Sequence, residues 1–170
     1  RVLFRSKREP SLWIIFHLCN LLSRMGQLKT LTWRDSKADE STFNKLFYNL
    51  RKVKSLKSIR LDLKNIRHLL AQDKKDLLLS IRRLTKLSEM TLNLGMVNMG
   101  TSELFYKGIE GLKTAINEAI SLKEVNLNLG NCANLVQKGW VSLVEIKNLR
   151  QLGLENVRNK EFKELISLIL

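Results

Sequence analysis

A short phrase, Leu-x-x-apolar-x-apolar, occurs five times along this chain, and each copy is followed by a polar loop and a helical stretch. The copies begin at Leu28, Leu56, Leu87, Leu122 and Leu149, so the spacings between them are 28, 31, 35 and 27 residues. A repeat of this length that carries one short strand is typical of a solenoid, in which successive units stack on one another. The phrase therefore predicts a repeat architecture instead of one closed globular core.

Each repeat is expected to contain one strand and one helix. Residues 59–63, 90–94 and 125–129 alternate apolar and polar side chains, which predicts strands that are buried on one face. Turn-forming residues come next, and then apolar side chains at helical spacing, as at 43–50, where Ser41 or Thr42 is expected to cap the helix. No single unit can bury its apolar stripe, so stacking has to supply the core.

These repeats resemble the leucine-rich-repeat family, specifically the strand-plus-helix variety typified by ribonuclease inhibitor. The sequence Leu-Asn-Leu-Gly at 92–95 and again at 127–130 carries the resemblance best. Trp33 in an aliphatic position, Gly153 inside a strand and the lack of a consistent loop asparagine depart from it. The resemblance implies an α/β leucine-rich-repeat solenoid, a horseshoe arc with parallel strands on its concave face and helices on its convex face. It also implies that the strand face binds another macromolecule.

We expect one domain over residues 1–170, an array of about five to six divergent repeats. The segment Arg1-Val2-Leu3-Phe4 lies one repeat before Leu28 and matches the strand of a further unit. With one proline and eight glycines the chain has no linker-like segment. Since solenoids normally end in polar caps and residues 165–170 are apolar, we expect an uncapped array or a fragment of a longer chain.

The alternation also predicts which side chains point out of the strands and are candidates for binding a partner. They are polar and close to neutral in sum, with arginines in the first repeats and carboxylates prevailing later. The candidate partner-binding residues on the strand face are Thr30, Thr32, Arg34, Ser58, Arg60, Asp62, Glu89, Thr91, Asn93, Glu124, Asn126 and Asn128.

The net charge of +14 belongs wholly to the first half of the chain. Residues 1–86 hold 21 Lys and Arg against 7 Asp and Glu, whereas residues 87–170 hold 9 of each. Seven of these cations fall at the ends of predicted helices, and stacking should bring them side by side. This basic ridge comprises Arg24, Arg51, Lys52, Lys54, Arg82, Arg83 and Lys86.

The basic ridge has an ordinary explanation and a functional one. Cations near a helix C-terminus stabilise the helix by a few tenths to about 1 kcal/mol. Alternatively, the ridge is a footprint for RNA, for an acidic protein surface or for anionic lipid. Only 6% of the residues are aromatic and no RNA-binding signature is present, so RNA would be held through its phosphates, with strong salt dependence.

The sequence holds no constellation that is typical of an enzyme. His17 lies in an apolar helix as a core or boundary residue, and His68 has no partner at ligand spacing. The isolated Cys19 and Cys132 are expected to be buried, reduced thiols, which favours an intracellular, reducing compartment, the cytoplasm first. No metal or cofactor is expected, because zinc needs about four convergent ligands. The apolar segment 12–22 is too short to span a membrane, which takes about 20 residues.

The sequence therefore favours a non-enzymatic protein–protein interaction scaffold, a subunit of a larger intracellular assembly that binds protein partners. The alternative is a ribonucleoprotein component whose basic residues, within 1–86, contact RNA phosphates. A third class, the recognition domain of a sensor or of a ubiquitin-ligase adaptor, would need flanking domains.

Overall fold

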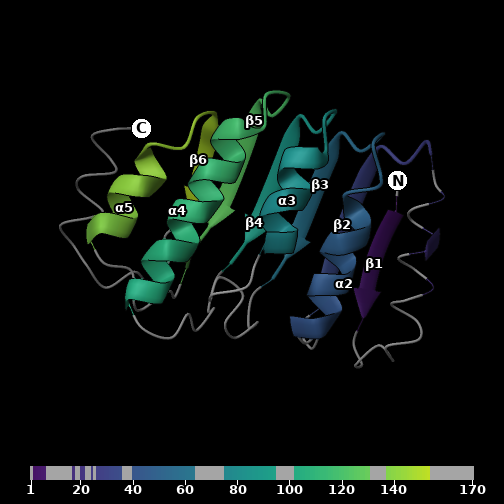
Figure 1. Cartoon of the computed structure of the whole chain (residues 1–170), viewed down its shortest axis with the longest axis horizontal. Helices are drawn as coiled ribbons and strands as arrows, with labels where there is room; N and C mark the ends of the chain where they lie inside the picture. The colour runs from purple at the N-terminus through teal and green to yellow at the C-terminus, as the bar shows by residue number, and fades with distance from the viewer. Residues whose placement is uncertain are drawn as a thin grey trace.

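One parallel sheet of six strands faces a layer of helices in the computed structural model of the chain (Figure 1). The strands follow one another in the sheet in their sequence order. From the second strand to the sixth, a helix lies between each strand and the next along the chain, which is the arrangement the repeats predict. The structure describes residues 2–6, 26–35, 40–63, 75–94, 102–130 and 137–153, and the helical positions His17, Asn20, Leu21 and Arg24.

The strands are short and of nearly equal length: β1 (Val2–Ser6), β2 (Thr30–Asp35), β3 (Ser58–Asp62), β4 (Glu89–Asn93), β5 (Glu124–Asn128) and β6 (Leu149–Gly153). The labelled helices are α2 (Glu40–Leu50), α3 (Lys75–Arg83), α4 (Ser102–Glu118) and α5 (Gln137–Val144). Helix α2 begins before Ser41 and Thr42, so neither residue caps it as the sequence suggested. The first helical position is Glu40.

Equivalent positions of the repeated phrase lie side by side in the sheet. One row is Leu31, Ile59, Met90 and Val125, and the next is Trp33, Leu61, Leu92 and Leu127. All eight side chains are at most 4% exposed. Since side chains alternate along a strand, the polar residues between them lie on the open face of the sheet.

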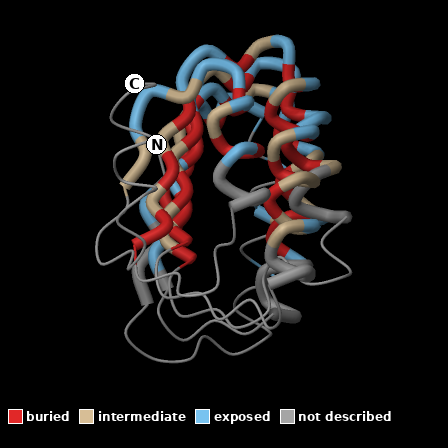
Figure 2. The backbone as a smooth tube through the Cα atoms, turned by 90° about the vertical axis from the view of Figure 1, so that its left-hand side faces the viewer, coloured by how far each residue is buried: buried red, intermediate tan, exposed pale blue. Residues whose placement is uncertain are grey.

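The core lies between the two layers. The first leucines of the phrases, Leu28, Leu56, Leu87 and Leu122, are at most 2% exposed. Figure 2 shows buried residues in both layers, with exposed residues along the loops by which helices pass into strands. Burying a leucine fully stabilises the fold by about 1.5–3 kcal/mol. Fold class and layer order are confirmed as an α/β leucine-rich-repeat solenoid.

A ladder of main-chain hydrogen bonds aligns the start of each strand with the next. The carbonyl of Lys29 accepts from the amides of Lys57 (2.8 Å) and Ser58 (3.0 Å). The carbonyl of Lys57 accepts in the same way from Ser88 (2.8 Å) and Glu89 (3.0 Å). The residues after the first leucine of each phrase therefore form one continuous edge of the solenoid.

Some sequence expectations fall differently in the structure. His17 is exposed on its helix and is not a core residue. Cys19, Cys132 and His68 lie outside the described residues. None of the helices in the described ranges combines the length and the hydropathy that crossing a membrane requires.

Candidate binding groove and basic edge

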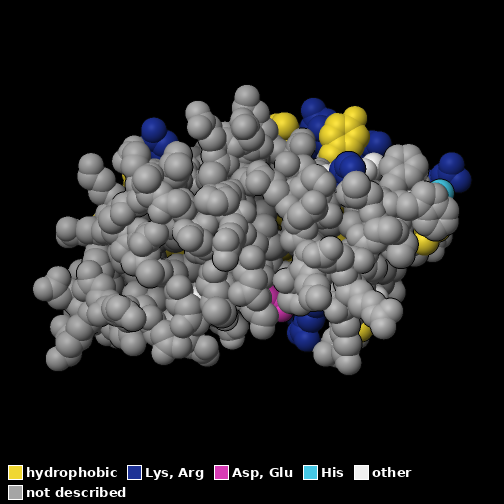
Figure 3. Space-filling view, turned by 90° about the horizontal axis from the view of Figure 1, so that it is seen from below, with side chains coloured by type: hydrophobic (Ala, Val, Ile, Leu, Met, Phe, Trp, Pro, Cys, Tyr) yellow, Lys and Arg dark blue, Asp and Glu magenta, His cyan; other side chains and the backbone are white. Residues whose placement is uncertain are grey.

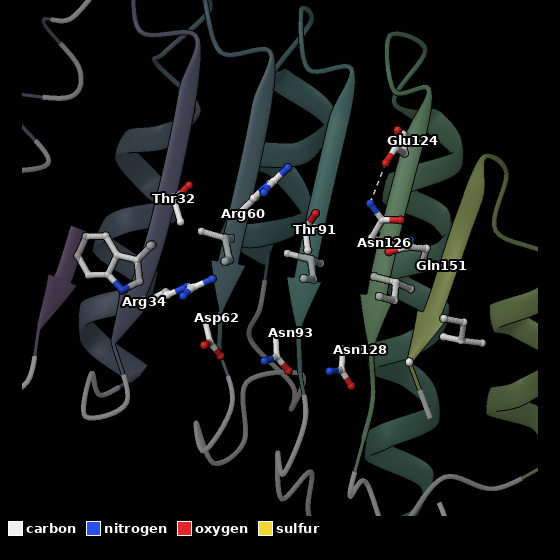
Figure 4. A pocket seen from close by; sticks show the side chains of 16 residues that line it. Thr32, Arg34, Arg60, Asp62, Thr91, Asn93, Glu124, Asn126, Asn128 and Gln151 are labelled. Atoms are coloured by element: carbon white, nitrogen blue, oxygen red, sulfur yellow. Dashed lines mark hydrogen bonds between the residues drawn. The ribbon is translucent and has the colours of Figure 1, made fainter. Parts of the chain in front are cut away.

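The open face of the sheet is hollowed into a groove of about 700 Å³ that runs across strands β2 to β6 (Figure 4). Nine of the twelve candidate partner-binding residues line this groove: Thr32, Arg34, Arg60, Asp62, Thr91, Asn93, Glu124, Asn126 and Asn128. Strand β6 adds Gln151 and Gly153 to the lining. The structure thus brings most of the candidate residues together into one concave polar surface.

Thr30, Ser58 and Glu89, the first residues of their strands, do not line the groove, whereas Glu124, the first residue of β5, does. Ser58 is only 8% exposed, and Thr32, inside the groove, only 6%. Both are small side chains between larger cross-strand neighbours: Thr32 pairs in register with Leu3 and Arg60. The expectation that Thr32 and Ser58 offer an exposed surface to a partner is therefore wrong.

Two exposed arginines occupy the β2–β3 side of the groove. Figure 4 shows Arg34 extending from β2 toward β3, and Arg60 extending from β3 toward β4. Arg34 is paired in register with Asp62. Among the described residues, however, neither guanidinium makes an ion pair or hydrogen bond. Both therefore present their fork of N–H donors to the groove.

The floor of the groove holds two acceptors that lack donors. The Oδ1 atoms of Asp62 and Asn126 are buried and accept no hydrogen bond from the described part of the chain. Asn126 is oriented by donation from its Nδ2 to Glu124 Oε1, at 2.9 Å, the dashed line in Figure 4. A buried acceptor without a donor costs about 1–3 kcal/mol. Both atoms have almost no accessible surface, so a ligand in the groove does not reach them where they lie.

A glycine shapes the far end of the groove. Asn128 Oδ1 accepts a 2.8 Å hydrogen bond from the amide of Gly130, which fixes its side chain. A Cβ atom at Gly153 would lie 3.1 Å from both Cγ and Oδ1 of Asn128. The departure from the repeated phrase at Gly153 is thus explained by the room that the Asn128 amide needs.

Four cations of the predicted basic ridge already have partners within the fold. The guanidinium of Arg51 lies 3.6 Å from the centre of the Tyr48 ring, and Lys52 Nζ lies 5.0 Å from it. Lys54 Nζ donates to the carbonyl of Arg83 (2.9 Å). The residues Arg82 and Glu118 form an ion pair between Nε and Oε2 at 2.5 Å. The dipole explanation and local packing account for part of this charge.

The sequence analysis missed three lysines of the same edge. Lys29, Lys57 and Lys123 are exposed and directly follow the first leucine of their phrases. The signal was the recurring pair Leu-Lys inside the phrase itself. We call these three lysines, together with the seven residues of the basic ridge, the basic edge. Going from β2 through β3 to β4, the first carboxylate among the described residues at the strand starts is Glu89.

The basic edge lies where the helices end and the strands begin, along the top of Figure 1. The opposite edge is seen in Figure 3, where few described side chains are visible. Lys and Arg outnumber Asp and Glu among those that are visible. Among the described residues, no three His, Cys, Asp or Glu side chains converge to hold a metal ion.

No family model matches this chain. No curated protein matches it either. Among solved structures, the chain is similar to the tropomodulin C-terminal domain of Caenorhabditis elegans, with a TM-score of 0.56 and 16% identity over 91% of this chain and 90% of that one. A TLR13–ssRNA13 complex is also similar, with a TM-score of 0.47 and 20% identity over 80% of this chain and 16% of that chain. The tropomodulin likeness and the sheet order together show the leucine-rich-repeat fold, and nothing about function.

Proposed function

We propose that this chain is a non-enzymatic protein-interaction module that holds a partner in the groove on the open face of its sheet. The observation that carries this proposal is the set of polar groups in the groove that lack partners within the fold. Arg34 and Arg60 offer guanidinium donors, and the exposed Gln151 offers an amide. In a groove of about 700 Å³ these groups suit a polar segment of another chain.

The proposal extends to the setting in which the module works. A polar groove and a basic edge on one solenoid are two chemically distinct surfaces, which supports a role as a subunit of a larger assembly. We place that assembly in a reducing intracellular compartment because the two cysteines, Cys19 and Cys132, are far apart in the sequence. The repeats are proposed to be of the ribonuclease-inhibitor-like type, supported by the alternation of a strand with a helix in every described repeat.

A bulky substitution in the groove tests the function. Thr91 is half-buried on β4, at the middle of the groove, and its side chain points away from the core. We expect Thr91→Trp to fold normally and to lose partner proteins that co-purify with the wild type. Thr85→Trp is the matched control, because Thr85 is exposed in a turn of the basic edge.

Three outcomes are decisive in that comparison. Loss of a partner from Thr91→Trp, but not from Thr85→Trp, supports the groove as the binding site. Retention of every partner by Thr91→Trp overturns it. Unfolding of Thr91→Trp alone, seen by circular dichroism, would show that this side chain points inward.

A second candidate function is contact with RNA phosphates, and the exposed cations of the basic edge favour it. Lys29, Lys57, Arg83 and Lys86 are exposed, and neighbouring repeats bring them to one edge. Binding to generic RNA should weaken with salt, with a slope of about 0.7 per phosphate contact. Replacing these four residues with Gln should reduce the affinity and the slope together. Absence of binding at low salt, or binding unchanged in the variant, would end the RNA proposal.

A further inference from the structure

The charges of the groove are separated along the sheet. Arg34 and Arg60 lie on β2 and β3, and with Asp62 between them this end carries a net positive charge. Glu124 on β5 is exposed at the other side of the groove. Thr91 and the other lining residues of β4 in between are uncharged. A ligand lying across the strands therefore meets a positive region first and a negative region later.

The spacing between these regions restricts the ligand. Neighbouring strands are about 4.8 Å apart, and along the strands Glu124 is two register positions from Arg60 and four from Arg34. The Cα atom of Glu124 is therefore about 12 Å from that of Arg60 and about 20 Å from that of Arg34. In an extended peptide, residues i and i+4 point to the same side and lie about 13 Å apart. An acidic and a basic side chain about four residues apart in an extended chain match Arg60, with Arg34 beyond it, and Glu124.

The lining between the charged groups favours an extended peptide over a helix. It is made of hydroxyl and amide side chains, Thr91 and Asn93 on β4 and Asn126 and Asn128 on β5. An extended peptide carries free main-chain N–H and C=O groups along its whole length that can pair with such side chains, whereas a helix uses nearly all of them internally. Thr91 is short enough to leave room for the peptide backbone beside it.

We infer that the groove recognises an extended peptide segment of a partner protein with one acidic side chain at Arg34 and Arg60. A Lys or Arg side chain about four residues away lies at Glu124. The main chain between these two side chains pairs with the hydroxyl and amide side chains of β4 and β5 that line the groove. This inference rests on the proposed function and adds the chemistry of the partner to it.

A library of random linear peptides displayed on phage tests the inference. The library is selected on the wild-type chain after removal of peptides that bind Thr91→Trp, so that only groove-dependent peptides are retained. We expect the retained peptides to share an acidic and a basic residue about four positions apart. Neutralising either residue in a synthetic copy should weaken binding by roughly tenfold or more.

A second experiment exchanges the charges of the groove residues in the protein. Arg60→Glu and Glu124→Arg should each weaken the selected peptide by roughly tenfold. The double variant should bind a peptide whose acidic and basic residues have been exchanged, and bind it better than the original. Lys57→Glu and Glu89→Arg are matched controls outside the groove, with equal changes in charge and no expected effect.

The outcomes separate the inference from the function on which it rests. Groove-dependent peptides without the acid–base pair would overturn the inference and leave the interaction module standing. Retained peptides that become helical on binding would likewise overturn the inference and leave the interaction module standing. Failure to retain any groove-dependent peptide would count against both.

Discussion

The ammonium group of Lys54 donates a hydrogen bond of 2.9 Å to the main-chain carbonyl of Arg83, which belongs to the next repeat. Arg83 is the last residue of α3, so this lysine meets the negative end of a neighbouring helix. The hydroxyl groups of Ser55 and Ser121 join repeats in a similar way, donating to the carbonyls of Leu28 (2.8 Å) and Leu87 (2.9 Å). Side chains in the helix-to-strand turns therefore hold adjacent repeats together.

Removing the Lys54 ammonium should destabilise the fold modestly. Lys54→Met keeps the apolar stem and loses the hydrogen bond, so we expect the free energy of unfolding to fall by about 0.5–1 kcal/mol. Urea unfolding followed by circular dichroism measures this change. Lys57→Met is the control: its side chain is exposed on the same edge, and we expect a change within about 0.5 kcal/mol. Equal losses in the two variants would contradict a structural role specific to Lys54.

Replacing Gly153 with alanine should change the free energy of unfolding, and whether that free energy falls or rises should depend on Asn128. Gly153→Ala brings a Cβ to 3.1 Å from the Asn128 amide, which must move away from its 2.8 Å hydrogen bond with Gly130. We expect a net loss of about 0.5–1 kcal/mol in urea unfolding. In an Asn128→Ala background the clash is gone, and the same substitution should stabilise by about 0.4–1 kcal/mol. A loss of the same size in both backgrounds would refute the explanation of the glycine.

Trp33 should resist replacement by the residue that its repeat position normally carries. Its register neighbours are Phe4 on β1 and Leu61 on β3, the equivalent positions of β4 and β5 are leucines, and Trp33 is 0% exposed. Trp33→Leu leaves a cavity that we expect to cost about 2–3 kcal/mol, measured by the urea midpoint. Leu92→Met, a volume-conserving change in the same row, should cost less than about 1.5 kcal/mol. A nearly neutral Trp33→Leu would mean that the neighbouring repeats close around the smaller side chain.

Acid should weaken the contact between α4 and α5. The Ser142 hydroxyl donates to Glu110 and lowers its pKa; burial opposes this shift, and Lys113 adds to it. Lys113 Nζ lies 2.7 Å from Glu145 Oε2 and 3.0 Å from Glu110 Oε1. Both contacts raise the pKa of Lys113, and the contact with Glu145 has the larger effect. Because the pKa of Glu110 is lowered, its contribution is complete above the ordinary value of 4.5 and is lost as pH falls through the lowered one.

Lys113 contributes in the opposite sense, fully below its ordinary pKa of 10.5 and less as pH rises through the raised one. Ser142→Ala should therefore destabilise the chain at neutral pH, by an amount that shrinks toward about pH 3. Urea unfolding at both pH values measures the difference. Ser121→Ala is the control, because Ser121 donates to a carbonyl that does not titrate. A Ser142→Ala effect that is independent of pH would contradict the role of Glu110.

The strands and their facing could be predicted from the sequence because the leucine phrase is periodic at two scales. The two-residue alternation assigns each side chain to a face, and the longer repeat aligns that face between strands. The two rows of buried side chains that begin at Leu31 and Trp33 can therefore be predicted by counting residues along the repeats. The helix start at Glu40 did not follow, because Ser and Thr are suited both to a cap and to the first turn.

The candidate site was predictable in outline only. Alternation placed Arg34, Arg60 and Glu124 on the open face. It carries no information on whether larger neighbouring side chains bury a small side chain such as Thr32 or Ser58. It also does not reveal that Asp62 Oδ1 and Asn126 Oδ1 lack donors, since that depends on the torsion angles of each side chain. The role of Arg34, Arg60 and Glu124 in binding a partner stays a prediction.

The regular register between strands has a consequence for how such a groove can change. Arg60 and Glu124 are carried by strands that are two places apart in the sheet. Insertion or deletion of one whole repeat between them would alter their separation by one strand spacing, about 4.8 Å, and by no intermediate amount. The spacing of charges in such a groove can therefore evolve only in discrete steps, each close to the reach of one or two residues of an extended chain.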